Sequence, residues 1–206
     1  MNFLFTIKCI YIKEGKNMKY VYLMRHGQTL FNVQHKIQGF CDSPLTFLGI
    51  KQAKATKKEY FEHDKVNLEE AHCSTSERAI DTLKIVTDLP FKTHKDLREW
   101  NFGTYEGEGE HLNPPLPYND FFVQFGGESQ KQVVARINKA IISIAESSPY
   151  QHILIVSHAG AIANFYRKWE KYNTFERKYH FKNCSVLKYE YENGVFRLQS
   201  IFNPSC

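Results

Sequence analysis

The sequence has few cysteines, and none belongs to a metal-binding or redox motif. Five cysteines are scattered over 206 residues, without a CxxC pair. An odd number of dispersed cysteines argues against a disulfide framework and favours a reducing compartment. We therefore expect a cytoplasmic protein that folds around a hydrophobic core and holds no metal.

The sequence also lacks a hydrophobic run that could cross a membrane. The apolar stretch at residues 1–12 has only twelve residues and is interrupted by Lys8, whereas a membrane-spanning helix needs about 20. It has neither the basic start nor the small-residue cleavage site of a signal peptide. We expect no association with a membrane.

Residues 1–17 are predicted to be an extension outside the folded domain. The segment KEGKNM at residues 13–18 can be encoded almost wholly by purines, like a bacterial ribosome-binding sequence before a start codon. Lysines outnumber arginines 20 to 7, which fits an AT-rich bacterial genome. We therefore expect Met18 to be the natural start, and the alternative is an additional N-terminal strand or tail.

A strong excess of one charge is missing as well. The 27 basic and 22 acidic residues give a net charge of +5, without a long basic run. This mild excess favours a small anionic ligand over nucleic acid, which calls for a basic stripe with exposed aromatic side chains. The hydrophobic fraction of 42% and the aromatic fraction of 15% indicate a globular chain.

Strand and helix patterns alternate along the chain. Strands are predicted at residues 19–24, 68–74 and 152–157, and an extended run at 91–100 leads to Glu99 and turns Arg98 to its opposite face. The predicted helices begin near Thr46, Ser76, Glu128 and His158, and a late hairpin turns at Asn193-Gly194. This alternation predicts an α/β fold, a three-layer α/β/α arrangement with a mostly parallel central sheet.

The predicted domain organisation is simple. Residues 18–206 form one domain, with an insertion at about 104–127 where the periodicity gives way to Gly, Pro and aromatic residues. A long irregular segment of this kind inside a regular domain is often functional.

Two predicted strands end in the same way, in a His followed by a small residue. They are YLMRHG, with Arg25 and His26, and LIVSHAG, with His158. Because the carboxyl ends of parallel strands form one crevice, the two histidines could face each other across one site. Arg78 falls in the first turn of a helix, a position that favours anions, and Glu99 ends an extended run.

These residue types suit phosphate chemistry. An Arg can donate two hydrogen bonds to phosphate oxygens, a neutral His can act as a nucleophile, and a carboxylic acid can protonate a leaving oxygen. The set is consistent with phosphoryl transfer through phosphohistidine without a metal or another cofactor.

The chain resembles the histidine phosphatase superfamily, also called phosphoglycerate mutase-like, from about residue 19 to residue 191. The motifs follow in the expected order: RHG with Thr29 and Asn32, SPLTFLGIKQA, STSERA, LREWNFGTYEG, GES and SHAG. Two positions depart from the usual pattern, since Gln28 stands where Glu is frequent and Ala159 where Gly is common. The ordered set is far more specific than a lone RHG.

The resemblance implies a role for each site residue. His26 would be the nucleophile, Arg25 and Arg78 would clamp the phosphate oxygens, and His158 would add a hydrogen bond to the transferring group. Asn32 and Gln38 would contact the phosphate or the substrate edge. Glu99 would donate a proton to the leaving oxygen and then deprotonate water.

The composition of the insertion favours a phosphatase over a mutase. A mutase must hold a product with a second anionic group, yet residues 104–130 contain no Lys or Arg and five acidic residues. Several Tyr and Phe accompany them, which suits a neutral, cationic or partly apolar leaving group. We expect hydrolysis of a small-molecule phosphomonoester.

Alternatives remain at this stage. They are phosphoglycerate mutase-type transfer and a non-catalytic phosphate-binding protein. Candidate substrates include sugar phosphates, nucleotides and α-ribazole phosphate, and the late hairpin could support a homodimer.

Overall fold

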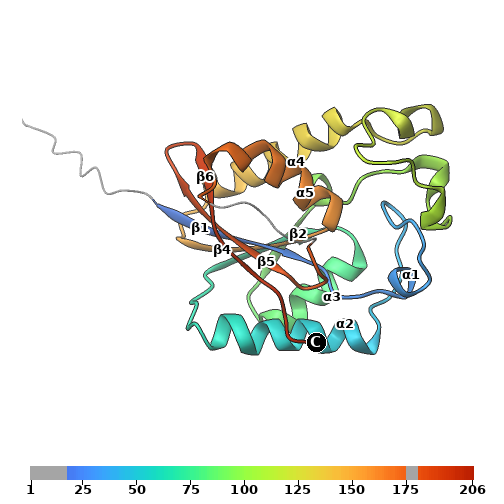
Figure 1. Cartoon of the computed structure of the whole chain (residues 1–206). Coiled ribbons are helices and arrows are strands. Elements are labelled where there is room, and N and C mark those ends of the chain that lie inside the picture. Colours follow the sequence, from blue (N-terminus) through green and yellow to red (C-terminus); the bar gives the residue numbers. More distant parts are fainter. Residues whose placement is uncertain (1–17, 175–180) are drawn as a thin grey trace, which may run out of the picture.

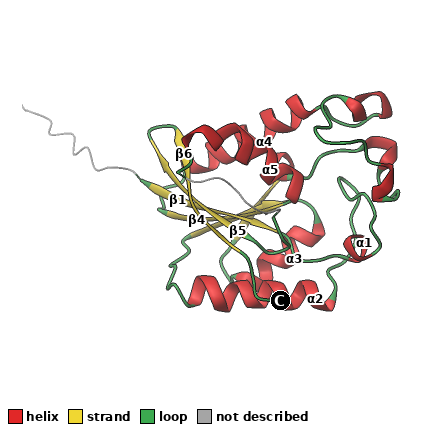
Figure 2. Ribbon diagram, viewed as in Figure 1, coloured by secondary structure: helices red, strands yellow, loops and turns green. Residues whose placement is uncertain are grey.

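The computed structural model describes residues 18–174 and 181–206, which form one twisted sheet with helices on both faces (Figures 1 and 2). The expectations for residues 1–17 lie outside the described residues. The six strands are arranged in the order β3-β2-β4-β1-β5-β6. The strand bounds are Lys19–Arg25 (β1), Glu70–Ser74 (β2), Phe91–His94 (β3), His152–Ser157 (β4), Val186–Glu192 (β5) and Val195–Phe202 (β6).

The first four strands are parallel to one another, and the last two are antiparallel to the strands beside them. β3 pairs with β2, β2 with β4, and β4 with β1 in parallel, whereas β5 runs antiparallel to both β1 and β6. The prediction of an α/β fold with a mostly parallel sheet is therefore confirmed. The hairpin prediction is also confirmed, because Asn193 and Gly194 both have positive φ, the geometry that a tight two-residue turn requires.

Helices α4 (Gln130–Ser147) and α5 (Ala159–Trp169) cover one face of the sheet, and α2 (Phe47–Thr56) and α3 (Glu77–Val86) cover the other (Figure 1). The central strands are apolar on both sides because alternate residues point to opposite faces. In β1, Leu23 packs into the core under α4 and α5, whereas Tyr22 and Met24 pack toward α2 and α3. Because of this alternation the sheet binds a helical layer on each face, and the predicted three-layer arrangement is confirmed.

Helices α2 to α5 begin within two residues of the predicted positions. Thr46 accepts a hydrogen bond from the Gly49 N–H at the start of α2, and Ser129 forms a capping box with Gln132 at the start of α4. After α2 the chain continues as a π-helical segment, η1 (Lys57–Glu62). A short helix that the sequence did not predict, α1 (Leu30–Val33), follows β1.

The extended run predicted at residues 91–100 is shorter in the structure. β3 ends at His94, and a 3₁₀ turn, η2 (Lys95–Leu97), precedes Arg98 and Glu99. The interpretation of Arg98 as a strand residue that faces away from Glu99 is therefore wrong. Both residues lie in a loop, so their directions are set by tertiary contacts and not by strand periodicity.

The insertion packs around a cluster of aromatic residues that includes two from the segment just before it. It contains the 3₁₀ turns η3 (Gly103–Tyr105), η4 (Glu110–Leu112) and η5 (Phe121–Phe125). Phe122 is fully buried and contacts the rings of Trp100 and Phe102 edge to face. Figure 1 shows this segment beside α1, at the end of the sheet toward which β1 points.

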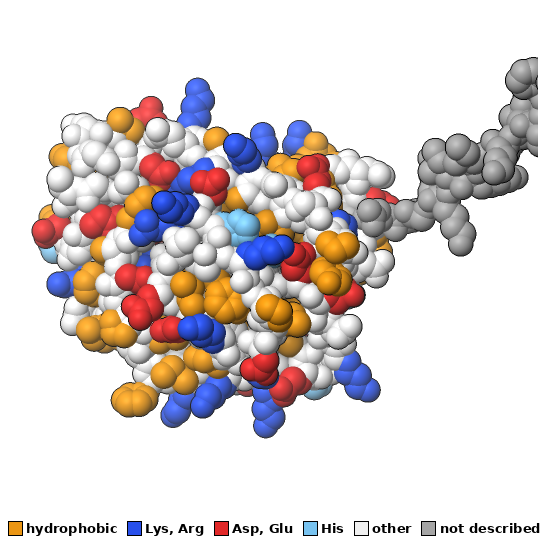
Figure 3. Space-filling view, turned by 180° about the vertical axis from the view of Figure 1, so that it is seen from behind, with side chains coloured by type: hydrophobic (Ala, Val, Ile, Leu, Met, Phe, Trp, Pro, Cys, Tyr) orange, Lys and Arg blue, Asp and Glu red, His pale blue; other side chains and the backbone are white. Residues whose placement is uncertain are grey.

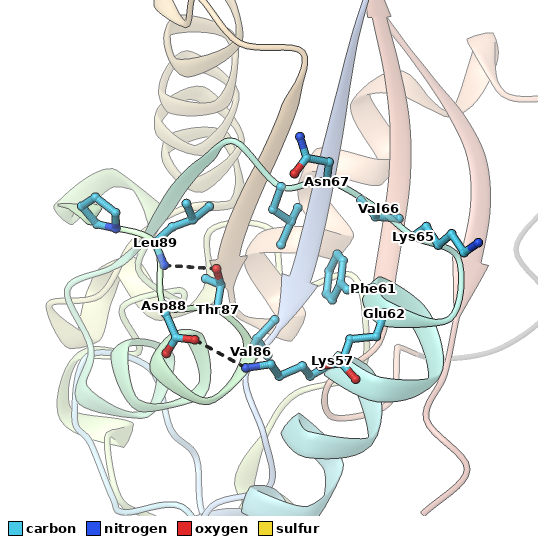
Figure 4. Close-up of a pocket in the computed structure, with 12 residues that line it drawn as sticks. Lys57, Phe61, Glu62, Lys65, Val66, Asn67, Val86, Thr87, Asp88 and Leu89 are labelled. Carbon is cyan, nitrogen blue, oxygen red and sulfur yellow. Dashed lines mark hydrogen bonds and ion pairs between the residues drawn. The ribbon is translucent and has the colours of Figure 1, made fainter.

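A hollow of about 730 Å³ lies at the other end of the sheet, near the start of β2 and the C-terminal ends of η1 and α3 (Figure 4). Phe61, Val66 and Val86 contribute apolar walls, and Lys57 pairs with Asp88 at 3.8 Å across it. It holds no His or Arg of the described residues.

Charges of both signs are interspersed over the face seen in Figure 3. No helix within residues 18–174 and 181–206 is long and apolar enough to cross a membrane.

The central strand predicts a stability test. Leu23 is fully buried in β1, so Leu23→Ala should lower the free energy of unfolding by about 2–5 kcal/mol. Leu112→Ala is the matched control, because Leu112 is 46% exposed, and its effect should stay within about 0.5 kcal/mol. Urea unfolding of both variants measures the difference, and equal effects would contradict the assignment of Leu23 to the core.

Candidate active site

The register between β1 and β4 brings the two strand-end histidines together. Arg25 pairs with Ser157, so the residues that follow, His26 and His158, leave the same edge of the sheet. Their ring centroids are 5.2 Å apart. The backbone N–H of His26 donates to the Ser157 carbonyl at 3.0 Å, and this bond holds the His26 backbone beside the end of β4.

The His26 ring has a defined orientation. Its Nδ1 lies 2.7 Å from the Gly27 carbonyl oxygen. Because a carbonyl can only accept, Nδ1 carries the proton, and Nε2 of the neutral ring keeps a free lone pair. His26 is only 4% exposed but lines a cavity, so its ring is largely shielded from bulk water.

Burial and nearby cations keep both imidazoles neutral. Desolvation lowers the pKa of His26 well below its usual range, and the guanidinium groups of Arg78 and Arg25 lower it further. The pKa of His158 is lowered well below its usual range for the same reasons, burial first and Arg78 next. Within residues 18–174 and 181–206, neither ring nitrogen of His158 has a hydrogen-bond partner.

Arg78 is fully buried at the start of α3 and is held by three acceptors. Nη2 donates to the Gly39 carbonyl at 2.9 Å, and Nη1 donates to the Cys41 carbonyl at 2.9 Å and to Asp42 Oδ1 at 2.8 Å. Asp42 also accepts from the Glu77 N–H through its other oxygen. Sequence reasoning missed Asp42, and its place in the motif CDSPLT is the signal that could have suggested it.

Arg25 reaches the same region from the end of β1. Its Nη1 donates to the Phe181 carbonyl at 2.7 Å. The buried Nε atoms of Arg25 and Arg78 have no hydrogen-bond partner among the residues that the structure describes. Two guanidinium groups therefore retain unused donors close to the two histidines.

The Glu99 carboxylate lies against the first turn of α5, the helix that follows His158. Oε1 accepts from the N–H groups of Trp100 and Ala161 at 2.8 Å, and Oε2 accepts from the Gly160 N–H at 2.7 Å. A Cβ at Gly160 would lie 2.6 Å from Glu99 Oε1. The last Gly of SHAG is therefore explained by the close approach of the carboxylate to the helix backbone.

Arg136 of α4 fixes the chain on either side of this carboxylate. It donates to the carbonyls of Arg98 at 2.6 Å and Glu99 at 2.7 Å, and it pairs with Glu128 of the GES motif at 2.7 Å. Arg98 points elsewhere, because its Nη2 donates to the Phe40 carbonyl at 2.7 Å. The position of Glu99 is therefore set by contacts between segments far apart in sequence.

Asn32 and Gln38 line the same cavity, but their polar atoms are partly used in local structure. Asn32 Oδ1 accepts from the Thr29 N–H at 3.1 Å and from Asn183 Nδ2 at 3.3 Å. Gln38 Oε1 accepts from the Thr29 hydroxyl at 2.7 Å, and its Nε2 donates to Ser43 Oγ at 2.9 Å. Asn32 Nδ2 is the better placed of these groups to donate to a ligand, because no hydrogen bond occupies it among the described residues.

The cavity that holds His26 and Glu99 has a volume of about 200 Å³. Its other walls include Lys36, Glu110 and Tyr118. A second hollow of about 280 Å³ shares Arg25, Tyr118, Ala159 and Gly160 with it and adds Trp100, Leu116 and Arg167. Together they offer a charged centre beside a more apolar extension.

The predicted site residues are thus brought together from four segments. Arg25, His26, Asn32, Gln38 and Glu99 line one cavity, with His158 against the His26 ring and Arg78 held by the turn at residues 39–42. In the part of the chain that the structure describes, no three His, Cys, Asp or Glu side chains are arranged to hold a metal ion.

Known proteins with similar sequences and structures carry names of both mutases and phosphatases. The chain is 30% identical over 192 residues to a protein of Yersinia pestis named "Probable phosphoglycerate mutase GpmB", covering 86% of this chain and 87% of that one. The crystal structure of phosphoglycerate mutase from Bacillus anthracis superposes with a TM-score of 0.77 at 25% identity, covering 90% and 93% of the two chains. A mycobacterial glucosyl-3-phosphoglycerate phosphatase solved with VO3 gives a TM-score of 0.73 at 25% identity, covering 91% and 100%.

These similarities support a phosphatase or a mutase activity. The sequence profile described as histidine phosphatase superfamily (branch 1) matches residues 21–204, almost the whole described chain. With the fold and the two-histidine site in place, the chain belongs to this superfamily.

Proposed function

We propose that the chain hydrolyses small-molecule phosphomonoesters through a phosphohistidine on His26, without a metal. The observation that carries the proposal is the free Nε2 lone pair of a buried neutral His26, beside His158 and two guanidinium groups. The transferring phosphoryl group spreads negative charge over its oxygens, so fixed cations and N–H donors supply much of the catalysis.

The residues divide the two half-reactions between them. Nε2 of His26 attacks phosphorus, and the bond from phosphorus to the leaving oxygen breaks while Glu99 gives that oxygen a proton. Water then attacks the phosphohistidine, Glu99 takes the water proton, and phosphate leaves with His26 restored. Arg25, Arg78 and His158 donate hydrogen bonds to the phosphoryl oxygens. Asn32 and Gln38 both contact the phosphate group or the edge of the substrate.

The acidic residues of the insertion are weaker evidence for hydrolysis than the sequence analysis implied, because the structure uses some of them within the protein. Glu106 and Glu128 bind backbone N–H groups, and Glu128 also pairs with Arg136. Of the five acidic residues at 104–130, Glu110 is the one among the described residues that lines the cavity. Lys36, which lies outside the insertion, lines it too.

Mutase activity is therefore the second candidate. Lys36 and Arg167 are cations on the walls of the two adjoining hollows, and either could hold a second anionic group of a phosphorylated acid. We favour hydrolysis because these two cations stand among aromatic and apolar walls that include Phe102, Tyr118 and Trp100.

The first prediction tests the nucleophile. A phosphomonoester panel should show release of inorganic phosphate that a chelator does not change. His26→Ala should lose more than the ~10²–10³-fold that removal of one hydrogen-bond donor costs, and it should no longer form acid-labile phosphoprotein.

The matched control is His63→Ala, because the His63 side chain is 78% exposed. This variant should keep full activity. Loss of activity with chelator would count against the metal-free mechanism, and phosphate binding without turnover on any substrate would identify a binding protein.

The second prediction concerns pH. His26 attacks only when Nε2 is unprotonated, and its pKa lies well below the usual 6.5. The acidic limb of kcat/KM should therefore fall well below pH 6.5, and activity should persist where an ordinary histidine is already protonated. The measurement uses a substrate that does not itself titrate over this pH range. An acidic limb of kcat/KM at or above pH 6.5 would argue against unprotonated His26 as the nucleophile.

The third prediction separates hydrolysis from mutase activity. With 3-phosphoglycerate, ³¹P NMR should show inorganic phosphate and not 2-phosphoglycerate. Lys36→Ala should raise KM for phosphoglycerate about tenfold, the loss expected from one charge-assisted hydrogen bond of ~1.5 kcal/mol. It should leave KM unchanged for an aryl phosphate whose leaving group carries no charge. Rapid interconversion of the phosphoglycerates would instead establish the mutase.

A further inference from the structure

One carboxylate of the insertion collects an unusual number of backbone donors. Glu106 Oε2 accepts from the N–H groups of Gly39 and Cys41, both at 3.0 Å, and Oε1 accepts from Phe40 at 2.7 Å and Phe102 at 3.0 Å. Three successive N–H groups that converge on one anion form a nest, a backbone arrangement suited to negative charge. Glu106 therefore fixes the N–H side of the turn at residues 39–41.

The carbonyl side of the same turn faces the arginines. The Gly39 and Cys41 carbonyls accept from Arg78 at 2.9 Å, and the Phe40 carbonyl accepts from Arg98 at 2.7 Å. Asp42, the next residue, accepts from Arg78 Nη1 at 2.8 Å. Every backbone N–H and carbonyl of residues 39–41 is thus used, with Glu106 on one side and the two guanidinium groups on the other.

The turn decides where the Arg78 guanidinium lies. Arg78 is fully buried, and a buried guanidinium must keep its hydrogen bonds because an unpaired buried charge is costly. Two of its three acceptors are carbonyls of the turn, and the third is the adjacent Asp42. A shift of the turn would move the guanidinium with it.

We propose that Glu106 is a positioning residue that holds Arg78 in place for the transferring phosphoryl group by fixing the turn at residues 39–42. The inference rests on the proposed function, because it assigns Arg78 to the phosphate. Glu106 acts at a distance, since it is not among the described residues that line the cavity with His26 and Glu99.

The number of donors explains why a carboxylate is needed there. Four N–H groups require two oxygens with four lone pairs, which Glu supplies. In Glu106→Gln one oxygen becomes an NH2 group, which would face two N–H donors across about 3 Å. Either Gly39 and Cys41 or Phe40 and Phe102 would lose their acceptor, so the turn should shift while the side-chain volume is unchanged.

The imidazole of His26 provides a sensor for this shift. It is influenced by Arg25 of its own strand and Arg78 of α3, and it lies against His158, which follows β4. The charged residues that line the cavity with it are Arg25, Lys36, Glu99 and Glu110. After burial, Arg78 is the next cause of its lowered pKa. If the guanidinium moves away, the His26 pKa should rise and the acidic limb of kcat/KM should move to higher pH.

The experiment compares wild type, Glu106→Gln and Glu108→Gln. Glu108 is exposed and lies two residues away, so its variant makes the same charge change without touching the turn. Binding of inorganic phosphate is measured by calorimetry, and the His26 pKa is measured by NMR titration. For Glu106→Gln we expect weaker phosphate binding, a raised His26 pKa, and a loss of kcat/KM of about 10–100-fold, the scale of a 1 Å displacement. Glu108→Gln should match wild type in all three.

A folding defect is separated by rescue. In Glu106→Ala, which leaves the nest open, acetate should restore phosphate binding and the low His26 pKa, whereas Arg78→Ala should show no rescue. The proposal is overturned if folded Glu106→Gln keeps the wild-type phosphate affinity and His26 pKa, or if its residual activity retains the wild-type pH limb. Because phosphate binding and NMR need no turnover, failure of wild type to hydrolyse any phosphomonoester would refute the proposed function alone.

Discussion

The parallel pairing of β1 with β4 is the constraint on which the site depends. Its register matches Arg25 with Ser157 and lets His26 and His158 leave the sheet side by side, although they are far apart in sequence. A slip of one residue would turn every side chain of a strand to the other face. Both strands are apolar on both faces and packed between two helical layers, so such a slip would bury different side chains on each side and is strongly disfavoured.

Burial gives this pair of histidines its chemistry. Removing an imidazole from water disfavours its charged form, and the two guanidinium groups act in the same direction. The cost of burying Arg78 is offset by two carbonyls and the Asp42 carboxylate. The result is a region of fixed positive charge around an uncharged nucleophile, an arrangement that water would weaken by screening.

The insertion contributes more by shaping the site than by its charge. Glu106 organises the turn that carries the acceptors of Arg78, and Glu128 holds Arg136, which in turn binds the backbone carbonyl of Glu99. Both carboxylates accept hydrogen bonds from groups within the protein. The net charge of a segment is therefore a poor guide to the ligand when its acidic side chains serve the backbone of neighbouring loops.

The sequence alone determined the layers, the mostly parallel sheet and the identity of the residues at the strand ends, because these follow from short-range periodicity and from the helix starts and motifs around Thr46, Ser76 and His26. Tertiary structure alone decided the direction of loop side chains. Arg98 and Glu99 are neighbours, yet one is drawn to the Phe40 carbonyl and the other to the N–H groups that begin α5. Asp42 and Glu106 likewise acquire their partners only when the chain is folded, since hydrogen bonds between distant segments leave no local pattern in the sequence.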